Sequence, residues 1–393
     1  MTNEVYILAA KRTAIGSMMG QFDKLAGHQL GATAIAAAVK SAGVEGKAVD
    51  EVLMGCVLPA GQGQAPARQA CLGAGLPISA RCTTVNKVCG SGMKTVMMAH
   101  DAIKAGSASV VVAGGMESMT NAPHLLPGAR QGYRMGSREV LDHMFYDGLR
   151  NPYDDKMMGV FAELCVEDGN FTREDQDDLT SRSVVNAQQS INEGYFKEEI
   201  AAVTISSRRG DTIVDTDEEP GRMNIEKIAT LRPAFKRDGG TVTAANSSKI
   251  SDGAAALVLA GSAQVEAAGY QPVAKIVAHS SFAHEPEWFT TAPVSAIKST
   301  LEKAGWTKDD VDLWEVNEAF AVVTLAAIKQ LDLDPDKVNI RGGACAMGHP
   351  IGASGARILV TLIHALKQKG LKRGVASLCI GGGEATAMAI ELV

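Results

Sequence analysis

The chain has 393 residues, of which 46% are hydrophobic and 21% charged, and it carries a formal net charge of −6 with a pI near 5.8. This composition is typical of a globular protein of two or three domains. No basic run is long enough to follow a phosphate backbone, and no apolar stretch approaches the roughly 18 residues of a membrane span. We therefore expect neither a nucleic acid nor a membrane as a partner.

The cysteines and the N-terminal segment indicate a reducing compartment. Seven cysteines are scattered along the chain, an odd number that does not suggest a disulfide framework, and no CxxC pair suggests structural zinc. The first twenty residues, MTNEVYILAAKRTAIGSMMG, include acidic Glu4 and lack the long apolar core of a secretory signal. We expect a cytoplasmic protein with reduced thiols and no metal site.

Strands alternate with helices in the first third of the chain. VYILAA and VDEVLMGCVL have the pattern of strands, and HQLGATAIAAAVKSAG that of a helix ending at Gly43. After CGSG, a helix is predicted to about Lys104, and SVVVAGGMESM follows as a buried strand running into a glycine turn. This alternation favours an α/β fold with a mainly parallel sheet covered on both faces.

The character changes between residues 121 and 248, where REDQDDLTSRS, FKEEI and VDTDEEPGR are dense in charge and Pro and Gly interrupt often. We interpret this part as an inserted loop domain. The α/β pattern returns at SDGAAALVLAGSAQVEAAG and continues to the C-terminus. The expected boundaries are 1–120 with 249–272 for a first half, 121–248 for the loop domain and 273–393 for a second half.

An internal similarity suggests that the two halves are related. CGSGMKTVMMAHDAIKAG leads to SVVVAGG in the first, and GASGARILVTLIHALKQKG leads to VASLCIGGG in the second. Each has a small residue, Ser and Gly, then a helix of about four turns, a glycine stop and an apolar strand. All βα units share some of this pattern, but duplication explains it better. The start of the helix after Cys89 and the turn after Cys379 could then meet at one site.

Four residues could carry chemistry. Cys89 precedes a predicted helix, and a helix N-terminus can lower a thiol pKa from about 8.5 into the range of about 3.5–7.5; free cysteine is equally often a buried apolar residue. His349 stands in the turn GHPIGASG, where a neutral imidazole could take a proton from a thiol. Cys379 ends a strand before three glycines, whose N–H groups could stabilise an oxyanion. Asn317, in WEVNEAF, could orient a water but more simply caps the next helix.

Taken together, VNKVCGSG, NEAF, GHPIGASGAR and CIGGG, in this order, resemble the motifs of the thiolase family over essentially the whole chain. GTVTAANSS and AGGMESM are similar to it too. Within the family, DLWEVNEAF and EPEWFTTAPVSAI most resemble acetyl-CoA acetyltransferases, also called acetoacetyl-CoA thiolases. The resemblance implies a thiolase-like fold of duplicated αβαβα layered halves plus an inserted loop domain.

The resemblance also implies catalytic roles. Cys89 would be acylated, with His349 as its activating base, and Cys379 would move the α-proton of the second acetyl-CoA. Asn317 would hold a water that helps His349 stabilise an enolate, and the N–H groups of Cys89 and Gly381 would form the other oxyanion hole. The implied reaction is the reversible condensation of two acetyl-CoA molecules through an acetyl-cysteine, with ping-pong kinetics and a place in fatty acid metabolism.

Coenzyme A thioesters are the implied substrates, and no separate cofactor is expected. Ser248 matches the position that contacts pantetheine, and Arg222 is a candidate for the nucleotide or its phosphates, although an arginine in a charged loop is usually just solvated. Met157 stands where many short-chain members have a histidine, which puts that pantetheine contact in doubt. The resemblance further implies a homotetramer, a dimer of dimers, with the segment from Leu125 to Met144 helping assembly.

Three further departures from the family pattern are Lys249 in KISDG, Arg341 in NIRGG and Cys345 near His349, the last most simply a small apolar filler. They bear on chain length rather than on reaction type. A thiolase for longer or 2-methyl-branched 3-ketoacyl-CoA therefore remains the main alternative. A β-ketoacyl synthase would need a second catalytic histidine, and a non-catalytic acyl-CoA or lipid carrier would not need this set of residues.

Overall fold

The computed structural model describes residues 4–393, so the first three residues of the predicted first half lie outside the described part. A single large sheet runs through the molecule in the order β13-β14-β15-β12-β1-β11-β5-β3-β4. Its strands in the first half of the chain are β1 (Val5–Thr13), β3 (Glu51–Gly55), β4 (Arg81–Val85), β5 (Val110–Ser118) and β11 (Ser251–Gly261). Those of the second half are β12 (Ala274–Ala283), β13 (Leu313–Val316), β14 (Arg373–Ile380) and β15 (Glu384–Leu392).

The two halves of this sheet repeat one topology. In the first, β4, β3, β5 and β1 run in one direction and β11 runs against them; in the second, β13, β14 and β12 share a direction and β15 opposes them. The halves join where β1 pairs with β12 through Tyr6 and Ile7. The predicted duplication and mixed, mainly parallel sheet are therefore confirmed.

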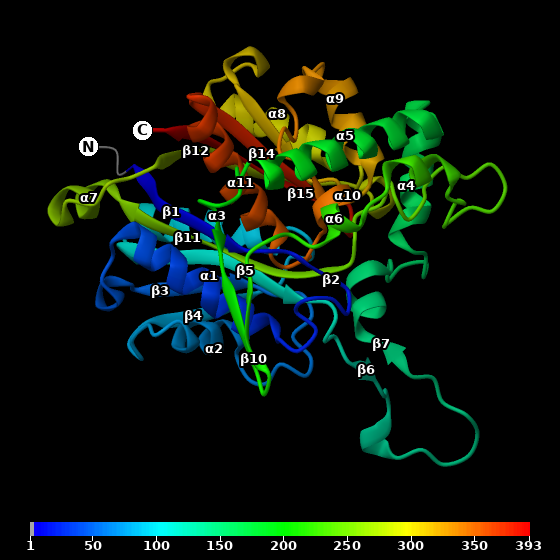
Figure 1. Cartoon of the computed structure of the whole chain (residues 1–393), viewed down its shortest axis with the longest axis horizontal. Helices are drawn as coiled ribbons and strands as arrows, with labels where there is room; N and C mark the ends of the chain where they lie inside the picture. Colours follow the sequence, from blue (N-terminus) through cyan, green and yellow to red (C-terminus); the bar gives the residue numbers. More distant parts are fainter. Residues whose placement is uncertain (1–3) are drawn as a thin grey trace.

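The two half-sheets form two layers of the molecule, and helices form three more: one on each outer face and one between the half-sheets. In the first half they are α1 (Gly27–Ala42), α2 (Pro66–Gly73), α3 (Ser91–Lys104) and α7 (Ser262–Ala268). In the second they are α8 (Ala292–Ala304), α9 (Ala321–Leu331), α10 (Ala344–Met347) and α11 (Ser354–Lys369). α1 and α2 cover one outer face and α8 the other, while α3 and α11 pack on each other between the two half-sheets (Figure 1). The helix predicted to end at Gly43 does so, with that glycine at φ 64°.

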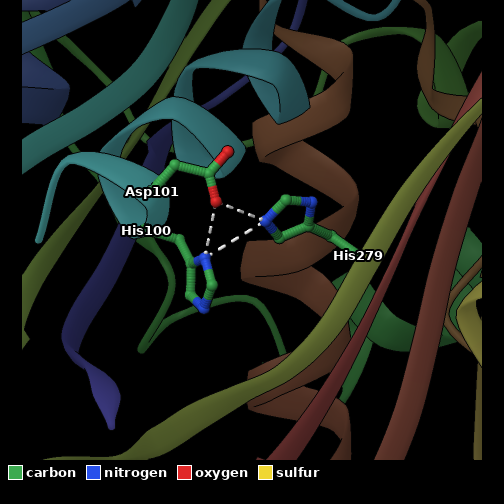
Figure 2. A group of neighbouring side chains, drawn as sticks. All are labelled: His100, Asp101 and His279. Carbon is green, nitrogen blue, oxygen red and sulfur yellow. Dashed lines mark hydrogen bonds and ion pairs between the residues drawn. The ribbon is translucent and has the colours of Figure 1, made fainter. Parts of the chain in front are cut away.

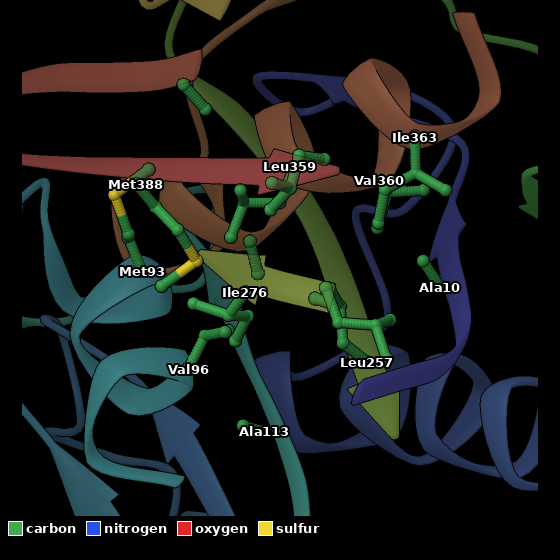
Figure 3. Close-up of a cluster of buried hydrophobic side chains, with 14 of the residues drawn as sticks. Ala10, Met93, Val96, Ala113, Leu257, Ile276, Leu359, Val360, Ile363 and Met388 are labelled. Carbon is green, nitrogen blue, oxygen red and sulfur yellow. The ribbon is translucent and has the colours of Figure 1, made fainter. Parts of the chain in front are cut away.

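The central layer is the main hydrophobic core (Figure 3). Met93 and Val96 from α3 meet Leu359 and Val360 from α11, with Leu257 of β11 beside them. These side chains are fully buried, so the layer contributes the hydrophobic free energy that holds the halves together. It also fixes the N-termini of α3 and α11 relative to each other.

One predicted turn is wrong. Gly114 and Gly115 do not end a strand but lie inside β5, which continues to Ser118. A Cβ on Gly114 would come within 2.0 Å of the carbonyl oxygen of Ala255, and one on Gly115 within 1.9 Å of that of Gly352. The glycines are therefore there for close backbone approach rather than for a change of direction.

The segment expected to form a loop domain carries two long helices and several short elements: β6 (His124–Leu125), β7 (Leu141–Asp142), α4 (Met158–Gly169), α5 (Arg173–Asn192), β8 (Ile200–Ala201), β9 (Val203–Ser207), β10 (Gly210–Val214) and α6 (Glu219–Arg222). β2 (Gly16–Ser17) pairs with β11. α4 and α5 pack on α9, and α5 also on α10, while β6 and β7 carry a long projecting loop (Figure 1). Among the described residues, no helix combines the length and apolar character needed to cross a bilayer.

Candidate active site

Cys89 lies in a tight turn just before α3. Val88 has φ 45°, a left-handed conformation that is unfavourable for a β-branched residue, and it marks strain at this turn. The hydroxyl of Ser91 holds the turn by accepting the N–H of Lys87 at 2.8 Å and donating to the carbonyl of Val88 at 2.7 Å. This strained turn places Cys89 at the start of α3, one of the two helices of the central layer.

The chain segment that ends β14 lies directly against this turn. A Cβ on Gly90 would come within 2.3 Å of Cδ1 of Ile380. The backbone N–H groups of Gly381 and of Cys89 itself lie close enough to the Cys89 thiol to lower its pKa. The thiol of Cys379, which precedes Ile380, is close enough for the charge of Cys89 to affect its pKa. The structure thus brings Cys89, Cys379 and Gly381 together from opposite ends of the chain.

The electrostatics of the two thiols differ from the sequence expectation. Burial raises the pKa of Cys89 to about 11, although the N–H groups of Gly381 and Cys89 act to lower it. The expected lowering by the helix N-terminus is therefore outweighed by desolvation. Burial also raises the pKa of Cys379 well above its usual range, and a charge on Cys89 raises it further. Both groups are thiols at neutral pH and need a base to react.

His349 has the properties of such a base. Its Nδ1 lies 2.5 Å from the hydroxyl oxygen of Ser354, which itself donates to the carbonyl of Pro350 at 3.0 Å. Because that hydroxyl proton is already used, Nδ1 must be the protonated nitrogen, and Nε2 keeps a lone pair. Nε2 is buried without a hydrogen-bond partner within residues 4–393. Burial, and then the charge of Arg357, lowers the pKa of His349 to about 3, so the ring is neutral.

Asn317 follows β13 and is almost fully buried. It does not cap the next helix, which begins four residues later with Phe320 as the preceding residue, so that simpler interpretation is wrong. Its N–H donates to the carbonyl of Ser377, two residues before Cys379. Neither polar atom of its amide has a hydrogen-bond partner in the described part of the chain. A buried amide with two free hydrogen-bonding atoms is suited to holding a water.

A pocket of about 240 Å³ opens beside these residues, and His349, Met157 and Ser248 all line it. Ile351 lines it too and belongs to the apolar cluster on which Cys89 packs. Ser248 is held in place by its N–H, which donates to the carbonyl of Ala319 at 2.9 Å. Met158 and Phe235 also line this pocket, and the sequence did not single them out. Met158 is shared with a neighbouring pocket that Gly381 lines.

Arg222 is not brought to this pocket. Arg222 is not among the described residues that line this pocket. It lies on α6, is mostly exposed and forms an ion pair with Glu218 at 3.2 Å. Two of the family departures also have local partners. The Lys249 ammonium donates to the carbonyls of Ala244, Ala245 and Ser247, which stiffens the loop behind Ser248. Arg341 stacks on Tyr195 at 3.7 Å.

Two buried carboxylates that sequence reasoning missed support the site. Glu117 of β5 accepts the N–H groups of Val57, Leu58 and Gly352 at 2.9–3.1 Å, and burial raises its pKa to about 7. It ties the loop after His349 to the end of β3. An acidic residue inside an otherwise apolar strand was the available signal.

Glu318 plays the matching part beside Asn317. It accepts hydrogen bonds from Ser183, Asn339 and the N–H of Cys345. The Cys345 thiol is fully buried and lies 3.6 Å from the carbonyl of Glu318, as expected of a small filler. The loop that leads to His349 is thus fixed to the end of β13.

Comparisons with known proteins identify the family of this chain. The family model of the thiolase N-terminal domain matches residues 5–263, and that of the thiolase C-terminal domain matches residues 270–392. The chain belongs to the thiolase family. The family predicted from the four motifs is confirmed, and so is the thiolase-like fold.

Individual relatives extend over full length. Acetyl-CoA acetyltransferase 2 of Arabidopsis thaliana is 50% identical over 99% of this chain and 97% of its own, and the acetyl-CoA acetyltransferase of Chromobacterium violaceum is 47% identical over 99% of both. The crystal structure of the Bacillus anthracis acetyl-CoA acetyltransferase has a TM-score of 0.97 at 41% identity, covering 100% of this chain and 99% of that one. A thiolase from Ascaris suum in complex with coenzyme A has a TM-score of 0.94 at 43% identity, covering 99% and 100%.

Proposed function

We propose that this thiolase is an acyltransferase that catalyses the reversible condensation of two acetyl-CoA molecules to acetoacetyl-CoA and CoA. The observation that carries the proposal is the convergence of two thiols at one place, with a neutral imidazole in the wall of the pocket beside them. A Claisen condensation needs one group to hold the acyl unit and a second to generate the carbanion, and the site has both. The relatives described above share the name acetyl-CoA acetyltransferase over the full chain.

In the first half-reaction, the Cys89 sulfur attacks the acetyl carbonyl as His349 Nε2 accepts the thiol proton. The carbonyl oxygen becomes an oxyanion, and the N–H groups of Cys89 and Gly381 that now face the sulfur are suited to stabilise it. As the tetrahedral intermediate collapses, CoA leaves and takes the proton from His349. The products are an acetyl thioester on Cys89, free CoA and a neutral imidazole.

In the second half-reaction, Cys379 removes the α-proton of another acetyl-CoA, and we assign the prior removal of its own proton to His349. Once Cys89 is acetylated it can no longer form a thiolate, so no charge on its sulfur can raise the pKa of Cys379 further. The carbanion attacks the thioester, acetoacetyl-CoA forms, and the released Cys89 thiolate takes the proton back from His349. Asn317, with its two free amide atoms, would hold the water that stabilises the enolate oxygen together with His349.

The experiment uses radiolabelled acetyl-CoA and mass spectrometry. Cys89→Ala should abolish acetylation, because the acceptor sulfur is gone. Cys379→Ala should still become acetylated yet fail to form acetoacetyl-CoA. Cys82→Ala, on edge strand β4, is the matched control and should do both. An acetyl group found on Cys379 in the unmodified protein would reverse the roles of the two thiols.

Ser248 and Met157 are our candidates for contacts with the pantetheine arm, since both line the pocket with His349. The proposed contact of Arg222 with the nucleotide stays a prediction from the sequence. The substrates themselves carry the only coenzyme that this reaction requires, so no other cofactor is proposed. Seven free thiols fit a reducing compartment, and we propose the cytoplasm and a place in fatty acid metabolism.

A thiolase for longer or 2-methyl-branched 3-ketoacyl-CoA is the second candidate. The pocket favours it through its apolar wall, which includes Met119, Phe145, Met157, Ile250 and Phe320. Values of kcat/KM for acetoacetyl-, 2-methylacetoacetyl- and 3-ketohexanoyl-CoA would separate the two. A preference for acetoacetyl-CoA supports the first proposal, and a higher kcat/KM for 3-ketohexanoyl-CoA or the branched substrate supports the second.

We further propose a homotetramer. The loop between β6 and β7 exposes apolar side chains that a monomer would not be expected to leave in water: Met135 is 91% exposed, Val140 57% and Leu126 50%. Sedimentation equilibrium should give the mass of four chains. Met135→Asp together with Val140→Asp should shift it to that of two, and an unchanged mass would exclude this loop from assembly.

A further inference from the structure

Two histidines and an aspartate meet at the far end of α3 from Cys89. His100 and Asp101 stand near the C-terminal end of that helix, and His279 reaches them from β12 (Figure 2). Among the residues that the structure describes, they are the only group of at least three His, Cys, Asp or Glu residues whose potential ligand atoms all lie within 4.8 Å of one another. The cluster lies outside the proposed active site, and the proposed reaction makes no use of it.

The three atoms form a nearly equilateral triangle. His100 Nδ1 and Asp101 Oδ1 are 3.0 Å apart, Asp101 Oδ1 and His279 Nε2 are 3.0 Å apart, and the two ring nitrogens are 3.1 Å apart. The imidazole rings are nearly perpendicular, at 89°, and one nitrogen of each ring faces the Asp101 oxygen (Figure 2). All three contacts have the length of a hydrogen bond.

Protons alone cannot satisfy all three contacts at once. Each ring nitrogen holds either a proton or a lone pair, and the ionised Asp101 oxygen only accepts. If both nitrogens donate to Asp101, they face each other as two donors at 3.1 Å. If His279 donates and His100 keeps a lone pair, that lone pair faces the carboxylate at 3.0 Å. With Asp101 ionised, every arrangement of protons leaves one edge of the triangle repulsive, whereas a cation bound to three lone pairs satisfies all of them.

We propose that His100, Asp101 and His279 bind a divalent transition-metal ion of the zinc class, with water as a fourth ligand. Zinc in a tetrahedral site sits about 2.0–2.1 Å from histidine nitrogen and about 2.0–2.2 Å from carboxylate oxygen, which separates neighbouring ligand atoms by about 3.3–3.4 Å. The observed separations of 3.0–3.1 Å need to open by only a few tenths of an ångström. The donor set of two imidazoles and one carboxylate suits zinc better than calcium or magnesium.

The surroundings allow a water ligand and supply part of the charge balance. The side chains of His100 and His279 are 13% and 15% exposed, while that of Asp101 is 60% exposed, so solvent reaches the cluster from the Asp101 side. Asp101 supplies one negative charge. Lys303 opposes binding, since its ammonium is anchored on the carbonyl of His279 at 3.1 Å. We therefore expect binding of moderate strength.

The consequence of such an ion would be structural. His100 and Asp101 belong to the first half of the chain and His279 to the second, so the ion would link α3 to β12 across the central layer. Because α3 begins directly after the catalytic turn, the link would stabilise the element that positions Cys89. Ligands separated by 178 residues form no spacing motif, which explains why the cysteine and histidine pattern predicted no metal.

The test measures zinc retention by the full-length protein. Chelator-treated protein is loaded with Zn²⁺, passed over a desalting column and measured by elemental analysis, and affinity is obtained by competition with a chromogenic chelator. Asp101→Asn and His100→Gln each remove one ligand, and circular dichroism confirms that each variant folds. His124→Gln, at an exposed histidine of β6, is the matched control.

The unmodified protein and His124→Gln should retain one equivalent more than Asp101→Asn and His100→Gln. Because changing even an outer-shell partner of a metal ligand costs about 10–100-fold, loss of a direct ligand should weaken binding by at least about 100-fold. Zn²⁺ should also raise the melting temperature of the unmodified protein and not that of the two ligand variants. Equal retention and affinity in all four proteins, or no retained zinc in the unmodified one, would overturn the proposal.

Discussion

The two helices of the central layer begin in the same way and serve opposite purposes. α3 and α11 both start with Ser followed by Gly, and the hydroxyl of each serine donates to a carbonyl three or four residues earlier. In α3, Ser91 also accepts the N–H of Lys87 and so holds the strained turn that presents a thiol. In α11, Ser354 instead accepts the proton of the His349 ring.

This difference shows how a duplicated unit acquires two complementary functions. The backbone geometry of the helix start is shared, but the group that donates a hydrogen bond to the serine differs. It is the peptide N–H of Lys87 in the first half and the imidazole of His349 in the second. In the proposed mechanism, one half therefore contributes the nucleophile and the other a base whose tautomer is fixed. Changes to one helix start and not the other should separate these two roles.

The largest effect is expected from removing the base. His349→Gln should lower kcat for both directions of the reaction by about 10²–10⁴-fold, because general acid–base catalysis contributes on that scale. Steady-state assays of acetoacetyl-CoA thiolysis measure this directly. His124→Gln serves as the control and should retain full activity. A loss of less than tenfold would mean that another group activates Cys89.

The next effect concerns the pH dependence of Cys89. Since burial raises its pKa to about 11, only a small fraction of Cys89 is thiolate at pH 7. As the pH rises toward the pKa, this fraction grows about tenfold for each pH unit. Alkylation by iodoacetamide, followed by mass spectrometry of the Cys89 peptide, should therefore accelerate about 100-fold between pH 7 and pH 9. A rate that reaches a plateau by pH 8 would instead indicate a stable thiolate–imidazolium pair.

Much of this fold could be predicted because its signals are local. The helix ending at Gly43, the extent of α3 to Lys104 and the strand ending near Cys379 follow from hydrophobic periodicity and glycine stops, which depend on neighbours in sequence. The repeat was visible for the same reason. The four catalytic candidates were found through their motifs. The structure brings Cys89 and Cys379 together and places His349 in the wall of the pocket beside them.

What could not be predicted depends on contacts between distant residues. The role of Gly115 is set by the carbonyl of Gly352, and that of Glu117 by the N–H of the same residue. The pKa of Cys89 is set by burial that no local pattern reveals. Asn317 was taken for a helix cap because the helix start could not be placed within four residues.

A smaller effect is expected from the two serines, and here the comparison becomes sharpest. Ser354→Ala frees Nδ1 of His349 and allows the other tautomer. We expect kcat to fall about 10-fold or somewhat more, as when the hydrogen-bond partner that orients a metal-binding histidine is removed, with KM little changed. Ser91→Ala should instead slow acetylation of Cys89 by loosening its turn. Each variant loses two hydrogen bonds, but the melting temperature should fall more in Ser91→Ala, because both of its bonds hold the strained turn.

The readout that distinguishes the serines is the pH profile. A change confined to packing would lower kcat at all pH values alike, whereas a changed tautomer alters the base itself and should shift the acidic limb of kcat for Ser354→Ala alone. Single-turnover acetylation measured from about pH 3 to pH 9 provides the comparison, because the pKa of His349 is about 3. Identical profiles for the two variants would show that the serines have equivalent roles.

The smallest effect tests the close packing of the two helix starts. A Cβ on Gly355 would come within 2.4 Å of the backbone nitrogen of Met93, and one on Gly92 within 2.8 Å of that of Ala356. Backbone atoms cannot move aside as a flexible side chain can, so each Gly→Ala change should lower the free energy of unfolding by about 1–3 kcal/mol. Gly221→Ala, where nothing lies within 4 Å, is the control and should change it by no more than about 0.5 kcal/mol. Urea unfolding measures all three. Equal stability of Gly355→Ala and Gly221→Ala would mean that the starts of α3 and α11 are not held in close contact. The geometry of the two helix starts would then be looser than the catalytic proposal requires.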